Sequence, residues 1–208
     1  MEDWMVVLTR SSKYGNNCVA GINMSNGAWV RLVTDDEKSH GGISDEDLVS
    51  WNGKRVDVLD VIDAPILGVC NDCIQPENVL LDRSICMEII GTMTLNDVLV
   101  FHPLERKEYI LGNAYRYITE ERVNTVGCSL TIVEVSDLVI TQEENLYGQP
   151  KTRARFIYQG IEYKNMAVTD YLYYSIIDGS EFDRAVIVVS IGTPYNGRYY
   201  KYVSAIFV

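Results

Sequence analysis

Few residues in this sequence have types and spacings that could support catalysis. The two histidines, His40 and His102, have no sequence neighbour at the spacing of a metal site or a catalytic triad. No glycine-rich loop has the form that cradles a phosphate group. The acidic runs 35–37 and 45–47 could bind a divalent cation, although adjacent carboxylates in a loop are more often simply solvated. We therefore expect no enzymatic activity and no cofactor.

The five cysteines include one closely spaced pair, Cys70-Asn-Asp-Cys73. Such a pair is half of a zinc site, and no second pair completes it. Three interpretations stay open, namely coincidental spacing, a structural zinc ion completed through the fold, and redox chemistry. Coincidence agrees with a reducing compartment, where cysteines behave as small buried apolar residues. We expect no bound metal.

Length and composition indicate a globular protein. The chain has 208 residues, of which 47% are hydrophobic, enough for one large domain or two small ones. No apolar run approaches the roughly 20 residues of a membrane span. The first residues are acidic and lack the basic region of a signal peptide. We expect a cytoplasmic protein with no membrane partner.

The charge is unevenly distributed along the chain. A net charge of −11 argues against unspecific adhesion to nucleic acid or to anionic membranes. Residues 1–147 carry 11 Lys and Arg against 24 Asp and Glu, whereas residues 148–208 carry 7 against 5. Ten of the fourteen tyrosines lie between Tyr147 and Tyr202. The C-terminal third is thus mildly basic and rich in tyrosine, although tyrosine is also a strong strand former.

Two β-hairpins are predicted near the ends of the chain. In residues 18–33, two apolar-rich runs are joined by Asn26-Gly27, which suits the positive φ angles of a type I′ turn. A similar unit consists of 184–191, a turn at 193–197, and 198–207. Residues 74–81 are expected to form a connector. Further strands are expected at 5–8, 55–64, 129–135, 153–159 and 161–168, and short helices after Thr94 and near Thr119.

These elements predict an all-β protein with minor α-helix, built from two small barrels. Residues 1–82 would form the first barrel and residues 129–208 the second. Residues 83–128 would form a mixed connector with short helices, packed on the barrels. Proline is scarce and no low-complexity tract occurs, which favours packed rather than flexibly linked halves.

Strand alternation indicates a cationic face in the second barrel. Lys151, Arg153 and Arg155 fall on one side of their strand at steps of about 7 Å, close to the phosphate spacing of an extended single strand. The opposite side is suited to a core. In the last strand, Tyr199 and Lys201 share a side, opposite Tyr200 and Tyr202. A tyrosine can stack on a base while a cation meets a phosphate.

The N-terminal part offers a second candidate surface. Trp29 and Arg31 share one side of the first hairpin, as either a stacking platform with a phosphate ligand or a core tryptophan covered by an arginine. Arg10 and Lys13 follow the first strand and are either plain surface or further contacts. The complete predicted nucleic-acid-binding set is Arg10, Lys13, Trp29, Arg31, Arg153, Arg155, Tyr163, Tyr199 and Lys201.

Four stretches, read together, resemble a known family. They are Lys13-Tyr-Gly-Asn-Asn-Cys-Val-Ala-Gly21 continuing to Trp29-Val-Arg31; Gln75-Pro-Glu-Asn78; Phe156-Ile-Tyr-Gln-Gly-Ile-Glu-Tyr163 with Val168-Thr-Asp170; and Ser190-Ile-Gly-Thr-Pro-Tyr195 leading to Tyr200-Lys201 and Ala205-Ile206. In this order they resemble the dual OB-domain family of prokaryotic proteins.

The resemblance implies two tandem OB-like barrels and association with bacterial conflict or defence systems, where such modules are thought to sense nucleic acid. The family supplies no established catalytic residues. OB barrels bind ligands on the face of their second and third strands, here the hairpin 18–33 and the region 153–168.

We predict a non-enzymatic module that binds single-stranded DNA or RNA. The alternative is a protein-interaction or regulatory module, which the acidity of residues 1–147 favours because a phosphate backbone would be repelled there. A third hypothesis is a metal-dependent enzyme that uses the acidic loops or Cys70 and Cys73.

Overall fold

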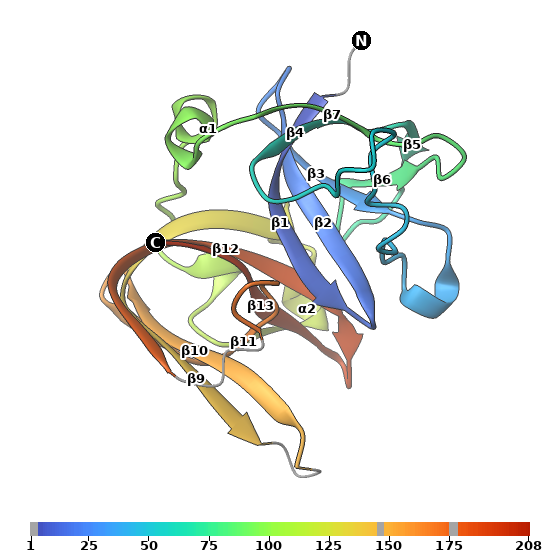
Figure 1. Ribbon diagram of the computed structural model, residues 1–208. Coiled ribbons are helices and arrows are strands. Elements are labelled where there is room, and N and C mark those ends of the chain that lie inside the picture. The colour runs from blue at the N-terminus through green and yellow to red at the C-terminus, as the bar shows by residue number, and fades with distance from the viewer. Residues whose placement is uncertain (1–3, 145–147, 175–178) are drawn as a thin grey trace. The chain divides into compact units, whose positions relative to one another are not determined.

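The computed structural model describes residues 4–144, 148–174 and 179–208. The chain divides into two compact units, Met1–Pro103 and Leu104–Val208 (Figure 1). Each unit is built on one curled sheet, which confirms the all-β prediction with minor helix. The segment 83–128, predicted as a connector, is divided between the units, with 83–103 in the first and 104–128 in the second.

The first unit is a seven-stranded sheet of order β5-β6-β3-β2-β1-β4-β7. Only Ala64 and Pro65 separate β4 from β5, although β4 pairs with β1 and β5 pairs with β6. These two strands are therefore halves of one barrel strand, broken at a proline that cannot donate to the ladder. The strands are β1 (Trp4–Lys13), β2 (Asn16–Asn23), β3 (Trp29–Val33), β4 (Asp60–Asp63), β5 (Ile66–Val69), β6 (Asn78–Leu81) and β7 (Glu88–Thr92).

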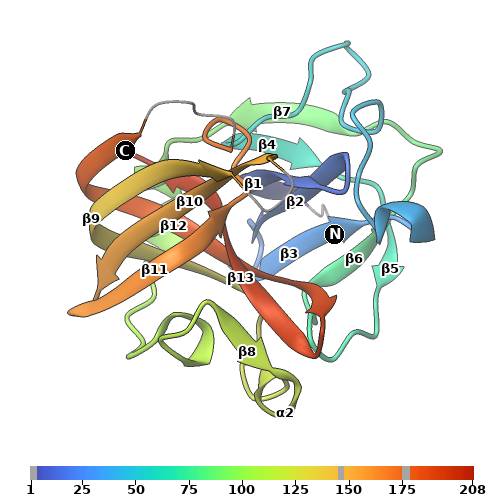
Figure 2. The same cartoon turned by 90° about the horizontal axis from the view of Figure 1, so that it is seen from below.

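The second unit contains a closed barrel of order β9-β10-β11-β13-β12, in which β12 returns to β9 (Figure 2). β13 pairs on one edge with β8 through residues 198–200 and with β11, in parallel, through residues 202–203. The strands are β8 (Tyr117–Thr119), β9 (Leu130–Glu144), β10 (Pro150–Tyr158), β11 (Ile161–Val168), β12 (Ser180–Tyr195) and β13 (Arg198–Phe207).

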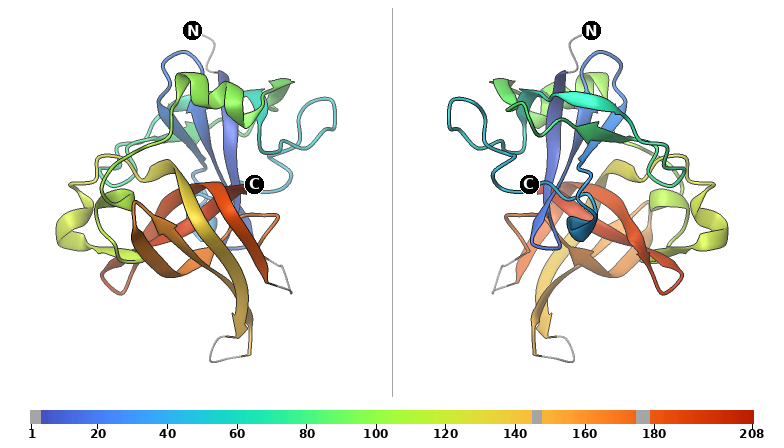
Figure 3. Two further views of the ribbon diagram at one scale, coloured as in Figure 1. Left: turned by 90° about the vertical axis from the view of Figure 1, so that its left-hand side faces the viewer. Right: turned by 90° about the vertical axis from the view of Figure 1, so that its right-hand side faces the viewer.

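Both units share the strand order of an OB barrel. In the second unit the first three strands are consecutive, and the fifth pairs in parallel with the third. The first unit repeats this order when β4 and β5 count as one strand, because β3 and β6 are its parallel pair. The strands of each unit can be followed by colour in Figure 3. The expectation of two OB-like units is confirmed.

The C-terminal hairpin turn and the predicted helices follow local chemistry. Asn196 and Gly197 both have positive φ, as a two-residue hairpin turn requires. The type I′ turn predicted at Asn26-Gly27 is wrong, because only Gly27 has positive φ and residues 24–28 form a longer loop in which Gly27 N donates to the Asn23 carbonyl. Thr94 caps α1 (Leu95–Phe101) in a capping box with Asp97. The remaining helices are α2 (Glu120–Val123), which begins with two glutamates as expected, and the 3₁₀ turns η1 (Glu37–Ser39) and η2 (Ile110–Gly112).

Several elements differ from the sequence expectation. The predicted strand 55–64 is reduced to β4, and the predicted connector 74–81 contains β6. The strands β5, β7 and β8 were not anticipated. β6 and β8 are short and find their partners far away in sequence, on β3 and β13, so local periodicity carries little signal for them.

Gly21 permits a close backbone approach between β1 and β2. A Cβ atom at this position would lie 1.9 Å from the carbonyl oxygen of Val6. We expect Gly21→Ala to lower the free energy of unfolding of the first unit by about 1–3 kcal/mol or to prevent its folding. Urea unfolding followed by tryptophan fluorescence measures this, because Trp4, Trp29 and Trp51 all lie in that unit.

Gly68→Ala is the matched control. Gly68 also lies in a strand of the first unit, and nothing is within 4 Å of its added Cβ. Its stability should change by less than about 0.5 kcal/mol. Equal unfolding midpoints for the two variants would contradict the steric explanation.

Candidate nucleic-acid interface

The predicted cations of β1 are only partly available to a ligand. Arg10 is buried, donates to the carbonyl of Val56 at 3.1 Å, and has Asp57 at 3.8 Å. Lys13 is half-buried, and burial lowers the pKa of its ammonium. Arg10 therefore stabilises the fold of the first unit, while Lys13 keeps partial exposure.

Arg31 belongs to a buried ion pair in the first unit. Its side chain is 2% exposed and lies 3.3 Å from the Glu77 carboxylate, which is equally enclosed. Its backbone N–H donates to the Glu77 carbonyl where β3 meets β6 in parallel. The expectation of a phosphate ligand at Arg31 is thus replaced by an internal role, because a buried guanidinium without its carboxylate would be strongly destabilising.

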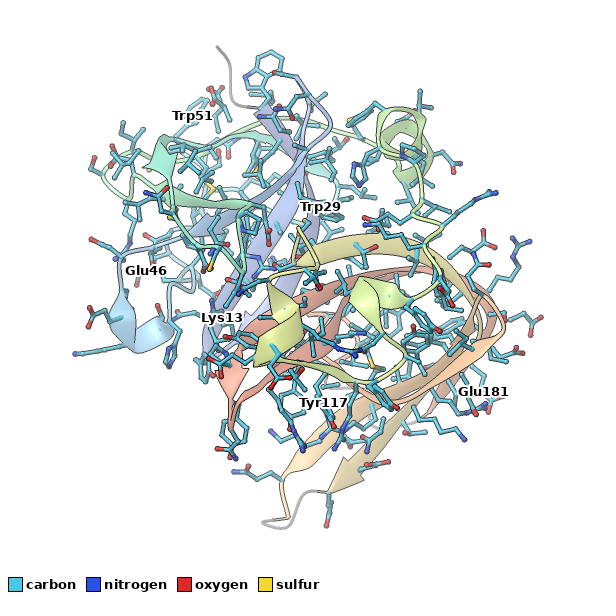
Figure 4. All side chains as sticks on the ribbon, turned by 180° about the vertical axis from the view of Figure 1, so that it is seen from behind. Lys13, Trp29, Glu46, Trp51, Tyr117 and Glu181 are labelled. Atoms are coloured by element: carbon cyan, nitrogen blue, oxygen red, sulfur yellow. The ribbon has the colours of Figure 1, made fainter. Side chains whose placement is uncertain are left out.

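Trp29 is also buried in the first unit. All five residues of β3 are buried, so the strand has no solvent face for a stacking platform. The Trp29 ring makes an edge-to-face contact with His102, with centroids 5.2 Å apart. His102 in turn lies 2.8 Å from the Gly27 carbonyl through Nδ1. Trp29 is therefore a core residue and not a stacking platform for a ligand (Trp29 is labelled in Figure 4).

Lys201 is the most enclosed cation of the second unit. Its side chain is 1% exposed, and its Nζ donates to the carbonyls of Ile110 at 2.5 Å and Asn113 at 2.7 Å. The Asn113 side-chain oxygen accepts a third bond at 2.9 Å. Burial lowers the pKa of Lys201 to about 7. This lysine fastens the segment around η2 to the barrel and does not reach solvent.

Tyr163 and Tyr199 also face the barrel interior. The Tyr163 ring stacks on Phe156 at 5.4 Å, and its hydroxyl accepts from Ile110 N and donates to the Asn113 carbonyl. Tyr199 is buried at the start of β13. Because Trp29, Arg31, Tyr163, Tyr199 and Lys201 are all interior, we do not carry them into the proposed interface.

The cations that were predicted for β10 lie on its outer face. Thr152, Ala154, Phe156 and Tyr158 are buried, whereas Lys151 and Arg155 are exposed and Arg153 is half-buried, so the predicted alternation is confirmed. Arg155 lies 3.4 Å from Glu162 on β11, and Lys164 lies 2.8 Å from the same carboxylate. Hydrogen bonding from Lys164, then Arg155, lowers the pKa of Glu162. One carboxylate thus serves two cations.

The two units differ in charge. The first unit carries 7 Lys and Arg against 16 Asp and Glu, a balance of −9. The second carries 11 against 13, a balance of −2. A polyanion is therefore repelled far less by the second unit.

Sequence reasoning chose the inner face of β13 and missed the outer one. Tyr200 and Arg198 lie on the outer face, beside Tyr117 and Tyr115 at β8. The strand register in the structure, which local alternation does not reveal, distinguishes the two faces. Lys201 is opposite Ile191 and Val203 is opposite Val189, so the apolar partners on β12 mark that face as internal.

Other candidate chemistry gains no support from the geometry. Among the described residues, no three His, Cys, Asp or Glu side chains are grouped so that they could hold a metal ion. Cys70 and Cys73 are both free thiols. In the described part of the chain, no helix has the length and apolar character needed to traverse a bilayer.

The lowered pKa of Lys201 predicts a pH-dependent stability of the second unit. Between about pH 7 and 10.5, the unfolded chain binds the lysine proton more tightly than the folded chain, so stability rises with pH. Relative to Lys201→Met, the native protein should gain about 2 kcal/mol between about pH 7 and pH 9. Urea unfolding followed by near-ultraviolet circular dichroism of tyrosine measures the difference. Parallel pH curves for the two proteins would contradict the burial effect.

A comparison with protein families agrees with the architecture. The profile of the dual OB-containing domain family matches residues 4–206. The crystal structure of the p204 HINb domain aligns with a TM-score of 0.41 and 9% identity, covering 98% of this chain and 96% of that chain. No curated protein matches. Since the family match spans nearly the whole sequence, the chain belongs to the dual OB-containing domain family.

Proposed function

We propose that the second unit binds single-stranded nucleic acid and performs no catalysis. The observation that carries this proposal is the outward alternation of Lys151, Arg153 and Arg155 on the second strand of an OB barrel. OB folds use the face of their second and third strands for oligonucleotides, so the fold is compatible with this function. A role as a sensor in bacterial defence and a cytoplasmic location stay predictions.

The spacing of the three cations suits an extended strand. Alternate residues of a β-strand are about 7 Å apart, and each cation can meet one phosphate while the bases turn elsewhere. Arg153 lies opposite Thr141 and Ala167, neither of which is charged. Lys151 lies opposite Glu143, and Arg155 shares Glu162 with Lys164. Arg153 is thus the cation with the least local competition.

Removing two of these cations should weaken binding because two electrostatic contacts with phosphates are lost. We expect Arg153→Ala with Arg155→Ala to reduce affinity for a thymine or uracil oligomer of about 12 nucleotides by roughly tenfold at low salt. The slope of log affinity against log salt should flatten by about 1.4, since each phosphate contact contributes about 0.7 for a single strand. Fluorescence anisotropy titrations at several salt concentrations measure both quantities.

Arg184→Ala is the control for loss of a cation elsewhere in the same unit. Arg184 is exposed on β12 and pairs with Glu134 on β9, the strand that separates β12 from β10. Its removal should leave affinity and salt slope within about twofold of the native values. If both variants weaken binding alike, the effect is one of net charge and the β10 face is not the site.

Glu162 should act as an internal competitor for phosphate. Replacing it by glutamine keeps a side chain of the same size and releases Arg155 and Lys164 from a carboxylate. We expect Glu162→Gln to raise affinity for the same oligomer by about two- to tenfold and to steepen its salt dependence. An unchanged or reduced affinity in the anisotropy titration would show that the ligand does not reach these cations.

A protein partner for the first unit is the second candidate function. Its balance of −9 disfavours nucleic acid, and several large apolar side chains are exposed on it, including Trp51, Leu67 and Val69. Purification from the native host separates the two functions. Bound nucleic acid, seen in the absorbance ratio, supports the first. A stoichiometric protein that is lost on Trp51→Ser with Leu67→Ser supports the second.

A further inference from the structure

We propose that Tyr115, Tyr117 and Tyr200, with Arg198, form a platform on which the second unit stacks unpaired bases. We call this group the tyrosine platform. It lies on β8, on the bend just before β8 that carries Tyr115, and on the start of β13, outside the β10–β11 face to which the proposed function assigns the phosphates (Tyr117 is labelled in Figure 4). The inference rests on that proposed function and adds the site that receives the bases.

The rings of the tyrosine platform form a continuous series. Tyr115 and Tyr117 have centroids 6.4 Å apart with an interplanar angle of 24°. Tyr117 and Tyr200 have centroids 5.9 Å apart. The guanidinium carbon of Arg198 lies 4.4 Å from the Tyr117 ring centroid, which is cation–π distance. Three side chains from two strands, with Tyr115 from the bend before β8, thus converge on one surface.

The sheet itself fixes this arrangement. Tyr200 is directly opposite Tyr117 in the antiparallel pairing of β13 with β8, and Arg198 is opposite Thr119. The intervening residues Ile118 and Tyr199 are buried and hold the two strands to the barrel. The core therefore does not need the outer rings, and Tyr115 remains 69% exposed.

Both signs of charge lie near the platform, because the exposed Glu120 and Glu121 directly follow Thr119, the residue opposite Arg198. Arg198 and Arg116 are both exposed, and neither forms a salt bridge with any residue in the described ranges. Two of the three cations on β10, by contrast, lie near carboxylates, since Lys151 faces Glu143 and Arg155 shares Glu162 with Lys164. A phosphate next to a stacked base could therefore meet an arginine without displacing a carboxylate.

A cross-strand row connects the platform with the cations of β10. Arg153 pairs with Ala167 on β11, and Ala167 pairs with Tyr202 on β13. Strands are about 4.8 Å apart, so this row spans about 10 Å, and Tyr200 is about 7 Å further along β13. Because Ala167 has a small side chain, no bulky group lies between Arg153 and Tyr202 in this row. A single strand that follows it would run from phosphate contacts to stacking rings.

The chemistry of the platform selects unpaired bases. Stacking on tyrosine requires an accessible base face, and paired bases in a duplex already cover each other's faces. Stacking is also tolerant of sequence, because every base has such a face. The expected ligand is therefore single-stranded DNA or RNA without strong sequence preference.

Paired substitutions separate the rings from their bulk. Tyr117→Leu with Tyr200→Leu keeps apolar side chains and removes the aromatic faces, while Tyr117→Phe with Tyr200→Phe keeps the faces and removes only the hydroxyls. The probe is a thymine oligomer of about 12 nucleotides containing 2-aminopurine. We expect the leucine pair to weaken binding by tenfold or more, with an unchanged salt slope and reduced quenching of 2-aminopurine. The phenylalanine pair should remain within about twofold of native affinity and keep the quenching.

The outcomes distinguish this inference from the function on which it rests. If the native protein binds the oligomer and the leucine pair binds equally well with native quenching, the platform is overturned while the proposed function stands. If the native protein binds no oligomer at all, both are overturned. Circular dichroism of the leucine pair, compared with the phenylalanine pair, establishes that the barrel is intact. Should the leucine pair unfold, Arg198→Gln replaces it and must weaken binding by at least threefold to uphold the platform.

Discussion

The fold of each unit depends on a parallel pairing between strands that are far apart in sequence. β3 meets β6, and β11 meets β13, and these pairings complete the barrel order. Long-range closure loses chain entropy before it gains contacts. A buried polar group accompanies each closure. The first holds the Arg31–Glu77 ion pair, and in the second Asp170 accepts a hydrogen bond from the backbone of Ile206.

These buried polar contacts explain what the family motifs do. Gln75-Pro-Glu-Asn78 meets Trp29-Val-Arg31 at the first closure, where Asn78 also donates to the Gln75 side chain. Tyr163 and Lys201, which belong to two different motifs, both bond the Ile110–Asn113 segment in the second unit. These motif residues therefore contribute to the internal contacts that close the sheets.

Electrostatics assign the two units different surfaces. A chain of net charge −11 can meet a polyanion only where its cations are locally concentrated. The second unit offers such a place on the outside of its barrel, with carboxylates such as Glu162 moderating it. In the first unit Arg10 and Arg31 make internal contacts, and the unit as a whole has a charge balance of −9. Tandem units of one fold thus need not share one function.

The sequence by itself determined the C-terminal hairpin turn, the capped helix and the two faces of β10. Each depends on neighbouring residues, as in Asn196-Gly197, in Thr94 with Asp97, and in the alternation around Arg153. It did not determine that both sides of β3 are buried, or which side of β13 faces inward. Alternation divides a strand into two sides, but the partner strands decide which side is covered. Only the tertiary structure could therefore bury Arg31 and Lys201 and leave Arg198 and Tyr200 outside, because their partners lie far away along the chain.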